Sequence, residues 1–381
     1  MERAAIGSFF SALVALFIVL LSDATARATC CNTSYGTGAL PDGTGSSNSA
    51  FGYNALNGNT TGGGNTAVGY YSLFSNTSGG ANTATGELSL NFNTTGQFNT
   101  ADGFQSLNQN IDGSSNTAVG YSALFLNTSG NNNTANGDSA LFSNTTGFQN
   151  TAIGVLSLAR NKTGSNSTAI GYQALDDNTT GSSNTAAGMD ALMSNIAGSY
   201  NTATGTGALH GNNGNANTAT GVSSLYNNSS GGGNSATGVQ ALNHNISGGN
   251  NTAIGFNALY ENTSGQNNIG LGVNAGFNLT TGKNDIDIGN RGIAAESNTI
   301  RVGTQGTQTR AFIAGVSGSG VNGSAVVVNA AGQLGIVASS ARYKRDIRDM
   351  GSASAGLMKL RPVSFRYKND PEGVRQYGLV A

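Results

Sequence analysis

Residues 65–69 read Asn-Thr-Ala-Val-Gly, and the same pattern returns every 17 residues, beginning with the copy at Asn48. One interval, before the copy at Asn217, is shortened to 16 residues, and the fifteenth and last copy begins at Asp285. Position five of the pattern is Gly in all fifteen copies, and positions three and nine are Ala and Leu in thirteen each. A repeat this regular indicates the fold more strongly than any local pattern does.

The length of the repeat selects among repeat folds. Its 17 residues cannot hold a pair of helices or a propeller blade, but they suit one β-solenoid coil with two short strands and two turns. The first strand ends at the Gly of position five, where a positive φ costs little. The second surrounds the Ala-Leu pair, and turn residues such as Asn178–Gly181 close it. We therefore predict an all-β, parallel β-solenoid (β-roll) of about fifteen 17-residue coils over residues 48–290.

Each coil has predictable inner and outer positions. Strand alternation places positions one, three and five, which are Asn, Ala and Gly, on one face. The fixed Ala predicts a narrow interior, which the Leu of position nine fills from the opposite strand. Position four varies through Val68, Asp102 and Ile153, so we expect it to face outward. Stacked Asn side chains are expected to form amide ladders, and the thin core predicts lateral association of chains.

The copies at 150–154 and 251–255 both read Asn-Thr-Ala-Ile-Gly. They resemble the head repeats of YadA-type trimeric autotransporter adhesins, which read Asn-Ser-Val-Ala-Ile-Gly. The resemblance covers residues 48–290, although Thr often replaces Val and the copies are slightly longer here. It implies a left-handed parallel β-roll that assembles as a homotrimer and serves in adhesion.

Residues 1–28 carry the pattern of a secretory signal peptide. Arg3 supplies a positive start, Phe9–Leu21 is apolar, and small residues between Ala24 and Ala28 offer cleavage sites. This apolar stretch is short for a membrane span, so an uncleaved anchor is the less favoured alternative. We therefore expect a secreted or cell-surface protein with no stable membrane span in the mature chain.

An N-terminal linker is expected over residues 29–47, and it holds the only two cysteines, Cys30 and Cys31. Adjacent cysteines bond to each other only with strain, so no disulfide that staples the fold is expected. Two interpretations stay open. The thiols pair between chains at the base of an oligomer, or they lie in an end without a structural role.

The distribution of charge marks a boundary near the end of the repeats. Residues 48–290 hold 13 charged side chains, and the 40 residues from 342 to 381 hold another 13. Between these regions we expect a β-rich connector over residues 291–338. Its short strands are predicted at 299–303, 311–314, 325–329 and 333–338. Beyond it, a small α+β segment is predicted, with a helix at 352–360 and strands at 362–368 and 376–381.

Three motifs of this C-terminal segment resemble, in the same order, the self-cleaving intramolecular chaperones of tail spikes and endosialidases. They are residues 339–347, 360–368 and 377–381, which read SSARYKRDI, LRPVSFRYK and YGLVA. The resemblance implies that residues 339–381 form a partial chaperone domain, because the family continues into long helices. It also implies that such a domain assembles a trimeric β-fibre and then cuts itself off.

The same resemblance assigns Ser339 as the nucleophile, Lys344 as its base, and the bond between Ala338 and Ser339 as the cleavage site. A hydroxyl needs a base near neutral pH, and a lysine serves when burial lowers its pKa. Ser340 stands where the family commonly has Asp, so the choice between the two serines stays open. We expect at most a serine peptidase that acts on its own chain, with no activity on external substrates.

Composition and spacing disfavour other kinds of site. A net charge of −1 with only 9% charged residues offers no field that would attract nucleic acid. His210 and His244, the only histidines, lack Cys or acidic companions at ligand spacing, so no metal site and no cofactor are expected. The acidic pairs Asp176–Asp177 and Asp285 with Asp287 are interpreted as residues of solvated turns.

These features favour an exported, homotrimeric surface fibre of the adhesin type, with a host surface or a glycan as its ligand. The alternative is an ice- or surface-binding solenoid that uses rows of Thr, such as Thr66, Thr83, Thr100 and Thr117. A flat array needs two aligned Thr per coil, and the residue two positions on is Thr in only one of these four copies. A hydrolase of external glycans would need an acid pair in a cleft, which regular coils do not predict.

Overall fold

The computed structural model describes residues 31–41, 45–313, 326–336, 351–352, 361–366 and 375–380. The chain divides into two units after Gln308. The first unit holds 17 strands in one sheet, and the second holds two pairs of strands within the described residues. The signal peptide predicted for residues 1–28 lies outside the described part of the chain.

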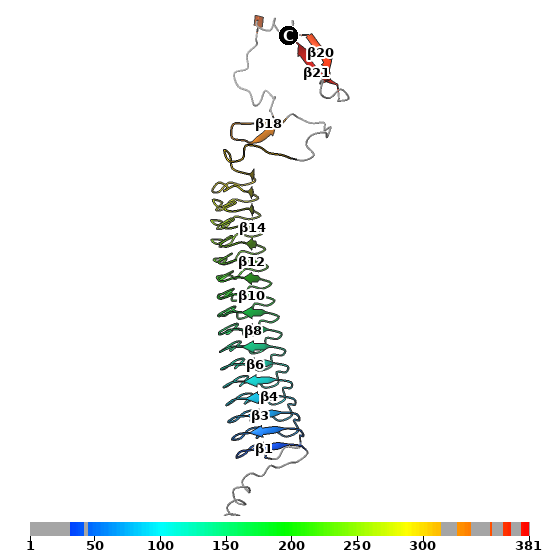
Figure 1. Ribbon diagram of the computed structural model, residues 1–381, viewed down its shortest axis with the longest axis vertical. Helices are drawn as coiled ribbons and strands as arrows, with labels where there is room; N and C mark the ends of the chain where they lie inside the picture. Colours follow the sequence, from blue (N-terminus) through cyan, green and yellow to red (C-terminus); the bar gives the residue numbers. More distant parts are fainter. Residues whose placement is uncertain are drawn as a thin grey trace, which may run out of the picture. The chain divides into compact units, whose positions relative to one another are not determined.

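Each strand of the first unit is three residues long and pairs in parallel with the next strand along the chain (Figure 1). The strands are β1 (Thr33–Tyr35), β2 (Ser49–Phe51), β3 (Thr66–Val68), β4 (Thr83–Thr85), β5 (Thr100–Asp102), β6 (Thr117–Val119), β7 (Thr134–Asn136), β8 (Thr151–Ile153), β9 (Thr168–Ile170), β10 (Thr185–Ala187), β11 (Thr202–Thr204), β12 (Thr218–Thr220), β13 (Ser235–Thr237), β14 (Thr252–Ile254), β15 (Ile269–Leu271), β16 (Ile286–Ile288) and β17 (Ile300–Val302). Equivalent residues pair across the sheet, as Ala118 does with Ala135. The predicted parallel β-solenoid is therefore confirmed, with about sixteen coils.

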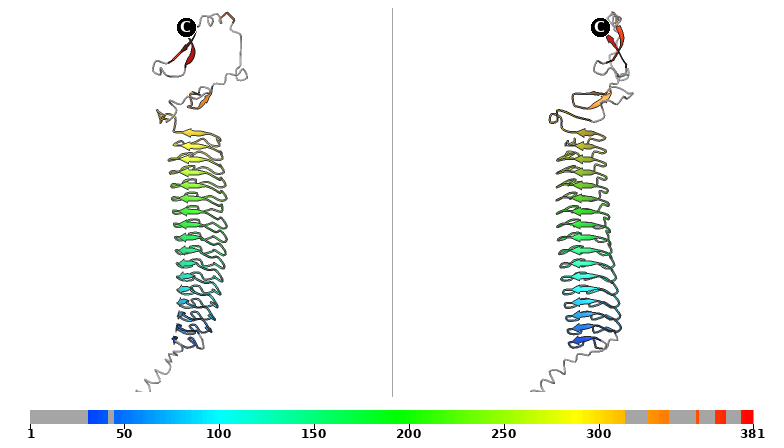
Figure 2. Two further views of the ribbon diagram at one scale, coloured as in Figure 1. Left: turned by 90° about the vertical axis from the view of Figure 1, so that its right-hand side faces the viewer. Right: turned by 45° about the vertical axis from the view of Figure 1, so that its right-hand side comes forward.

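The sheet extends one strand beyond the fifteen copies of the sequence repeat at each end. Ser34 in β1 and Arg301 in β17 stand where the repeat has Ala. Because of this difference, the sequence pattern does not reveal these two coils. The last coil is also shorter, because Ile286 pairs with Ile300. Figure 2 shows the arrows of β1 to β17 lying one above another along one side of the first unit.

The second strand predicted for each coil, around the Ala-Leu pair, does not form. Positions seven and nine instead adopt positive φ, as Ser122 (50°) and Leu124 (53°) do. Ala123 and Leu124 are both fully buried, whereas neighbours in an extended strand point to opposite faces. The turns still stack from coil to coil, because the Leu124 N–H donates to the Ala140 carbonyl at 2.9 Å. Each coil thus has one strand and a stacked series of turns.

The interior of the solenoid is as narrow as predicted. The Ala of position three and the Leu of position nine are fully buried in successive coils, as in Ala152 and Leu158. The outward direction of position four is confirmed by the exposure of Val68, Asp102 and Ile153. Strand β8 therefore shows the burial pattern of a strand whose central side chain alone points inward.

Two ladders of Asn side chains run along the interior. In the ladder predicted from position one, Asn116 Oδ1 accepts a hydrogen bond from the Asn133 backbone N–H at 2.9 Å. The second ladder occupies position twelve, where Asn144 Nδ2 donates to Asn127 Oδ1 at 2.8 Å. Both ladders also reach the Gly130 carbonyl, which accepts from Asn116 at 2.8 Å and from Asn127 at 3.0 Å. These bonds satisfy buried amides that would otherwise destabilise the fold.

The second unit contains two antiparallel pairs of strands within the described residues. Strands β18 (Val326–Val328) and β19 (Leu334–Ile336) pair with each other, and β20 (Arg361–Phe365) pairs with β21 (Gln376–Val380). These four strands fall where the sequence predicts them. Residues 311–313 are not a strand, unlike the prediction for 311–314, and residues 353–360 of the predicted helix lie outside the described residues.

Candidate functional site

The outer face of the sheet changes character at its C-terminal end. Position two is Thr or Ser in every strand from β1 to β14. In β15, β16 and β17 the same position is Ile, as Ile269, Ile286 and Ile300. Because position two points outward, this change exchanges a row of hydroxyls for a row of large apolar side chains.

The exposed apolar side chains of these three strands form one surface, which we call the C-terminal apolar patch. It consists of Ile269, Leu271, Ile288, Ile300 and Val302. Ile300 and Val302 are 69% and 73% exposed, and the parallel register places each beside its counterpart in β16. Contiguous apolar side chains on a surface mark a site of interaction rather than a feature of the isolated fold.

Four of the charged side chains in the same coils interact with one another. Asp287, at position three of β16, is 1% exposed and pairs in register with Arg301 of β17. Arg301 forms a bidentate ion pair with Glu296. Arg301 Nη2 lies 2.6 Å from Glu296 Oε2, and Arg301 Nε lies 2.9 Å from Glu296 Oε1. Asp285, also 1% exposed, accepts a hydrogen bond from the Thr299 backbone N–H at 3.0 Å through Oδ1. The end of the solenoid thus buries two carboxyl groups near one ion pair.

Burial controls the titration of both carboxyl groups. The pKa of Asp287 is raised to about 7, first by burial and then by the neighbouring Glu296, while Arg301 acts to lower it. Burial also raises the pKa of Asp285, against the lowering effect of the bond from Thr299. The Oδ2 atoms of both groups lack a hydrogen-bond partner. The interpretation of Asp285 and Asp287 as solvated turn residues is therefore wrong, because positions one and three point inward.

We expect the last coils to lose stability as the pH rises from about 4 to about 7. The folded chain holds the proton of Asp287 more tightly than an unfolded chain with the ordinary pKa of 3.8, so raising the pH favours unfolding in this window. Asp287→Ala, which restores the residue of most copies, should reduce this pH dependence, and the buried Asp285 should account for what remains. Hydrogen-exchange protection factors of β15–β17 at pH 5 and pH 8 measure it. Asp112→Ala, at an exposed carboxyl, is the control, and an unchanged pH dependence in Asp287→Ala would contradict the account.

The predicted processing residues lie outside the described part of the chain. This holds for Ser339, for Lys344 and for the cleavage bond that follows Ala338. It also holds for Cys30, whereas Cys31 is exposed and has a free thiol. The structure therefore neither brings the serine and the lysine together nor separates them.

The histidines have closer neighbours than spacing along the chain suggested. His210 stacks on Tyr226 with ring centroids 4.7 Å apart. His244 Nδ1 lies 3.2 Å from Glu261 Oε2, so the statement that it lacks an acidic companion is wrong. The reason is the register, which brings residues 17 apart side by side. Among the described residues, no group of three His, Cys, Asp or Glu side chains could hold a metal ion.

Comparison with known protein families identifies a family that matches the C-terminal residues. Residues 339–381 match the family described as chaperone of endosialidase. We call these residues the chaperone segment; such domains occur in extracellular fibres and are associated with trimer formation. No curated protein matches the chain, so the resemblance of the repeats to YadA-type heads stays a prediction. Within the described residues, no helix is both long and apolar enough to span a membrane.

The arrangement as a whole suits assembly better than catalysis. The C-terminal apolar patch is the feature that sequence reasoning missed. Its signal was present in the replacement of Thr by Ile at position two in Ile269, Ile286 and Ile300. The patch spans residues 269–302 in the last coils of the solenoid, and the chaperone segment follows it along the chain from residue 339.

Proposed function

We propose that the protein is an exported fibre subunit that assembles as a homotrimer with help from its chaperone segment. Three copies would pack their solenoids together at the C-terminal apolar patch. The family match supports the role of the chaperone segment in trimer formation. The patch is the observation that carries the proposal, because it supplies the surface that such a trimer needs to bury.

Once the trimer has formed, the chaperone segment cleaves itself off. Ser339 Oγ attacks the carbonyl carbon of Ala338, and Lys344 takes the hydroxyl proton. The C–N bond breaks, and the amine of Ser339 takes that proton, while an ester through the serine oxygen still joins the two segments. Water then hydrolyses the ester between Ala338 and the serine oxygen. Processing of this kind makes assembly irreversible, because the mature trimer no longer contains its chaperone.

The fibre then serves at the cell surface or outside the cell, where its long regular side presents side chains to a host surface or a glycan. The alternative of an ice- or surface-binding solenoid has weaker support. The register aligns Thr66 with Thr83, but a second Thr at position four occurs in consecutive coils only at Thr204, Thr220 and Thr237. Position two of the third coil is Ser235, so a flat array of two Thr columns spans only the two coils of β11 and β12.

The proposal predicts both the mass and the processing of the expressed full-length chain. We expect the purified product to sediment as three chains that end at Ala338, whereas Ser339→Ala sediments as three uncut chains. Mass spectrometry of the denatured products measures the cut, with Ser340→Ala as the matched control that should still be cleaved. An uncut parent would defeat the processing step, and a monomeric parent would defeat the proposed trimer.

A further inference from the structure

At position ten, aromatic rings of neighbouring coils stack on each other in pairs. Phe125 and Phe142 stack with their centroids 5.2 Å apart and their planes at 8°, and Tyr260 and Phe277 stack at 5.3 Å and 4°. Offset stacking of aromatic rings is favourable at such separations. The stacking of successive coils therefore allows flat rings at this position to pack face to face.

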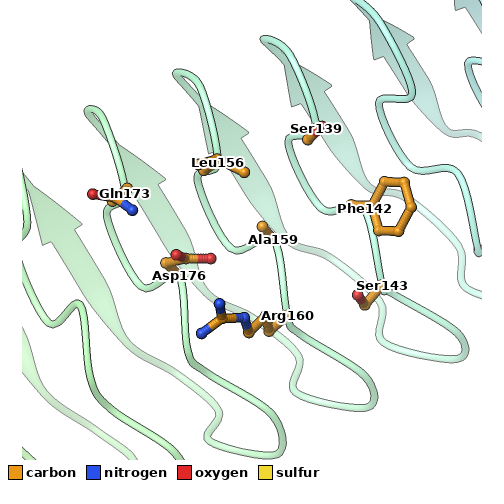
Figure 3. Close-up of a pocket in the computed structure, with 8 residues that line it drawn as sticks. All are labelled: Ser139, Phe142, Ser143, Leu156, Ala159, Arg160, Gln173 and Asp176. Atoms are coloured by element: carbon orange, nitrogen blue, oxygen red, sulfur yellow. The ribbon is translucent and has the colours of Figure 1, made fainter.

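The stack of Phe125 and Phe142 ends at Phe142. The next three coils carry Ala159, Asp176 and Met193 at position ten, so none of them adds a ring to the stack. The gap forms a notch of about 330 Å³ that Phe142, Ala159, Leu156, Gln173 and Asp176 line, together with Arg160 (Figure 3). Figure 3 shows Phe142 at one end of the notch and Asp176, with Gln173 beside it, toward the other.

The polar side of the notch is unusual for this fold. Asp176 is only 4% exposed, so its interpretation as a solvated turn residue is wrong. Burial raises the pKa of Asp176, and Arg160 and a hydrogen bond from Gln173 partly oppose that rise. Burying a carboxyl group costs free energy. At position ten, Asp176 also fills the space no better than the Phe or Met of nearby coils would. A buried carboxyl group that lines a notch beside an arginine and a glutamine is a candidate for binding a ligand.

We propose that this notch binds one ring of a neutral saccharide. The sugar ring would take the place of the missing side chain and stack its apolar face on Phe142. Its hydroxyl groups would donate hydrogen bonds to Asp176 and accept them from Arg160 and Gln173. The notch volume lies at the small end of ligand sites, which suits a single ring.

The charges of the site select against acidic sugars. Asp176 and Asp177 face one cation, Arg160, which already forms an ion pair with Asp177. A sugar carboxylate would meet an excess of negative charge, whereas neutral hydroxyl groups pair with either sign. The inference deepens the proposed surface role, on which it rests for its biological setting, but it requires neither the trimer nor cleavage.

Ligand-observed saturation-transfer NMR of the purified full chain tests the inference. The probes are methyl β-D-glucopyranoside, methyl β-D-galactopyranoside and the methyl glycoside of N-acetylglucosamine, with the methyl glycoside of N-acetylneuraminic acid as the acidic comparator. We expect saturation of at least one neutral probe. Ala159→Phe should abolish that signal, because the added ring fills the notch beside Phe142. Asp176→Asn should weaken the affinity about tenfold, because a charged hydrogen-bond acceptor is lost.

Met193→Phe is the matched control, since it adds a ring at position ten outside the notch and should preserve binding. Circular dichroism checks that each variant remains folded. A signal that survives in Ala159→Phe, saturation of the acidic probe alone, or no saturation of any neutral probe would overturn the inference. If no neutral probe binds to a chain that sediments as a trimer, the saccharide site fails while the proposed function stands. If a neutral probe binds to a chain that sediments as a monomer, the saccharide site stands and the proposed trimer fails.

Discussion

Gly154→Ala should destabilise the solenoid by about 3–5 kcal/mol, from backbone strain together with a steric clash. Gly154 occupies position five with φ at +126°, where an L side chain is strained. A Cβ atom there would lie 2.6 Å from the carbonyl oxygen of Gly171 in the next coil. Because this oxygen belongs to the backbone, the neighbouring coil must move to relieve the contact.

Gly211→Ala is the matched control for this substitution. Gly211 has no positive φ, and a Cβ atom there would meet only the Tyr226 carbonyl oxygen at 3.4 Å, an ordinary contact. We expect a change of about 0.5 kcal/mol or less. Urea unfolding measures both variants, and hydrogen exchange shows whether protection is lost first around β8 and β9. Equal stability of the two variants would contradict the close stacking of coils at position five.

The paired substitution Leu271→Lys with Ile300→Lys should convert the trimer into folded monomers. Both side chains lie exposed on the C-terminal apolar patch, so the coils themselves lose little when lysine replaces them. In a trimer that buries the patch, the added charges have no partner. We therefore expect the concentration at which the trimer dissociates to be at least about a hundredfold higher than for the parent. Sedimentation over a range of concentrations measures this shift.

Thr204→Lys with Thr220→Lys is the matched control for the patch. Thr204 and Thr220 occupy position four of β11 and β12, as Leu271 does in β15. Both are exposed, and the surface around them is polar. The control adds the same charge and should leave the trimer intact. Dissociation of both paired variants alike would show that charge on this face, rather than the apolar patch, decides assembly.

Much of the fold follows from the repeat, because one constraint acts on every coil. A constant period fixes the parallel register, and the register aligns Ala118 with Ala135 and the Asn of one coil with that of the next. The inward direction of positions one and three also follows from strand alternation. The same rule, applied to Asp285 and Asp287, predicts that both carboxyl groups are buried. The sequence therefore held enough information to predict their burial.

The turns could not be predicted in the same way. Leu124 adopts a positive φ that its own side chain disfavours, and no local propensity predicts this conformation. Only the stacked coils compensate for it, through the burial of Ala123 and Leu124 and the bond to Ala140. The contact between His244 and Glu261 likewise joins neighbouring coils rather than residues near in sequence.

The proposed packing of three chains at the patch can be tested directly by distances between chains. In a chain with Cys30→Ser and Cys31→Ser, a spin label at Leu271→Cys lies on the patch, and one at Thr281→Cys lies at an exposed position of the same coil outside it. Pulsed electron paramagnetic resonance should find the labels of different chains much closer together at residue 271 than at residue 281. Labels that are closer at 281, or no distance between chains at either position, would contradict assembly through the patch.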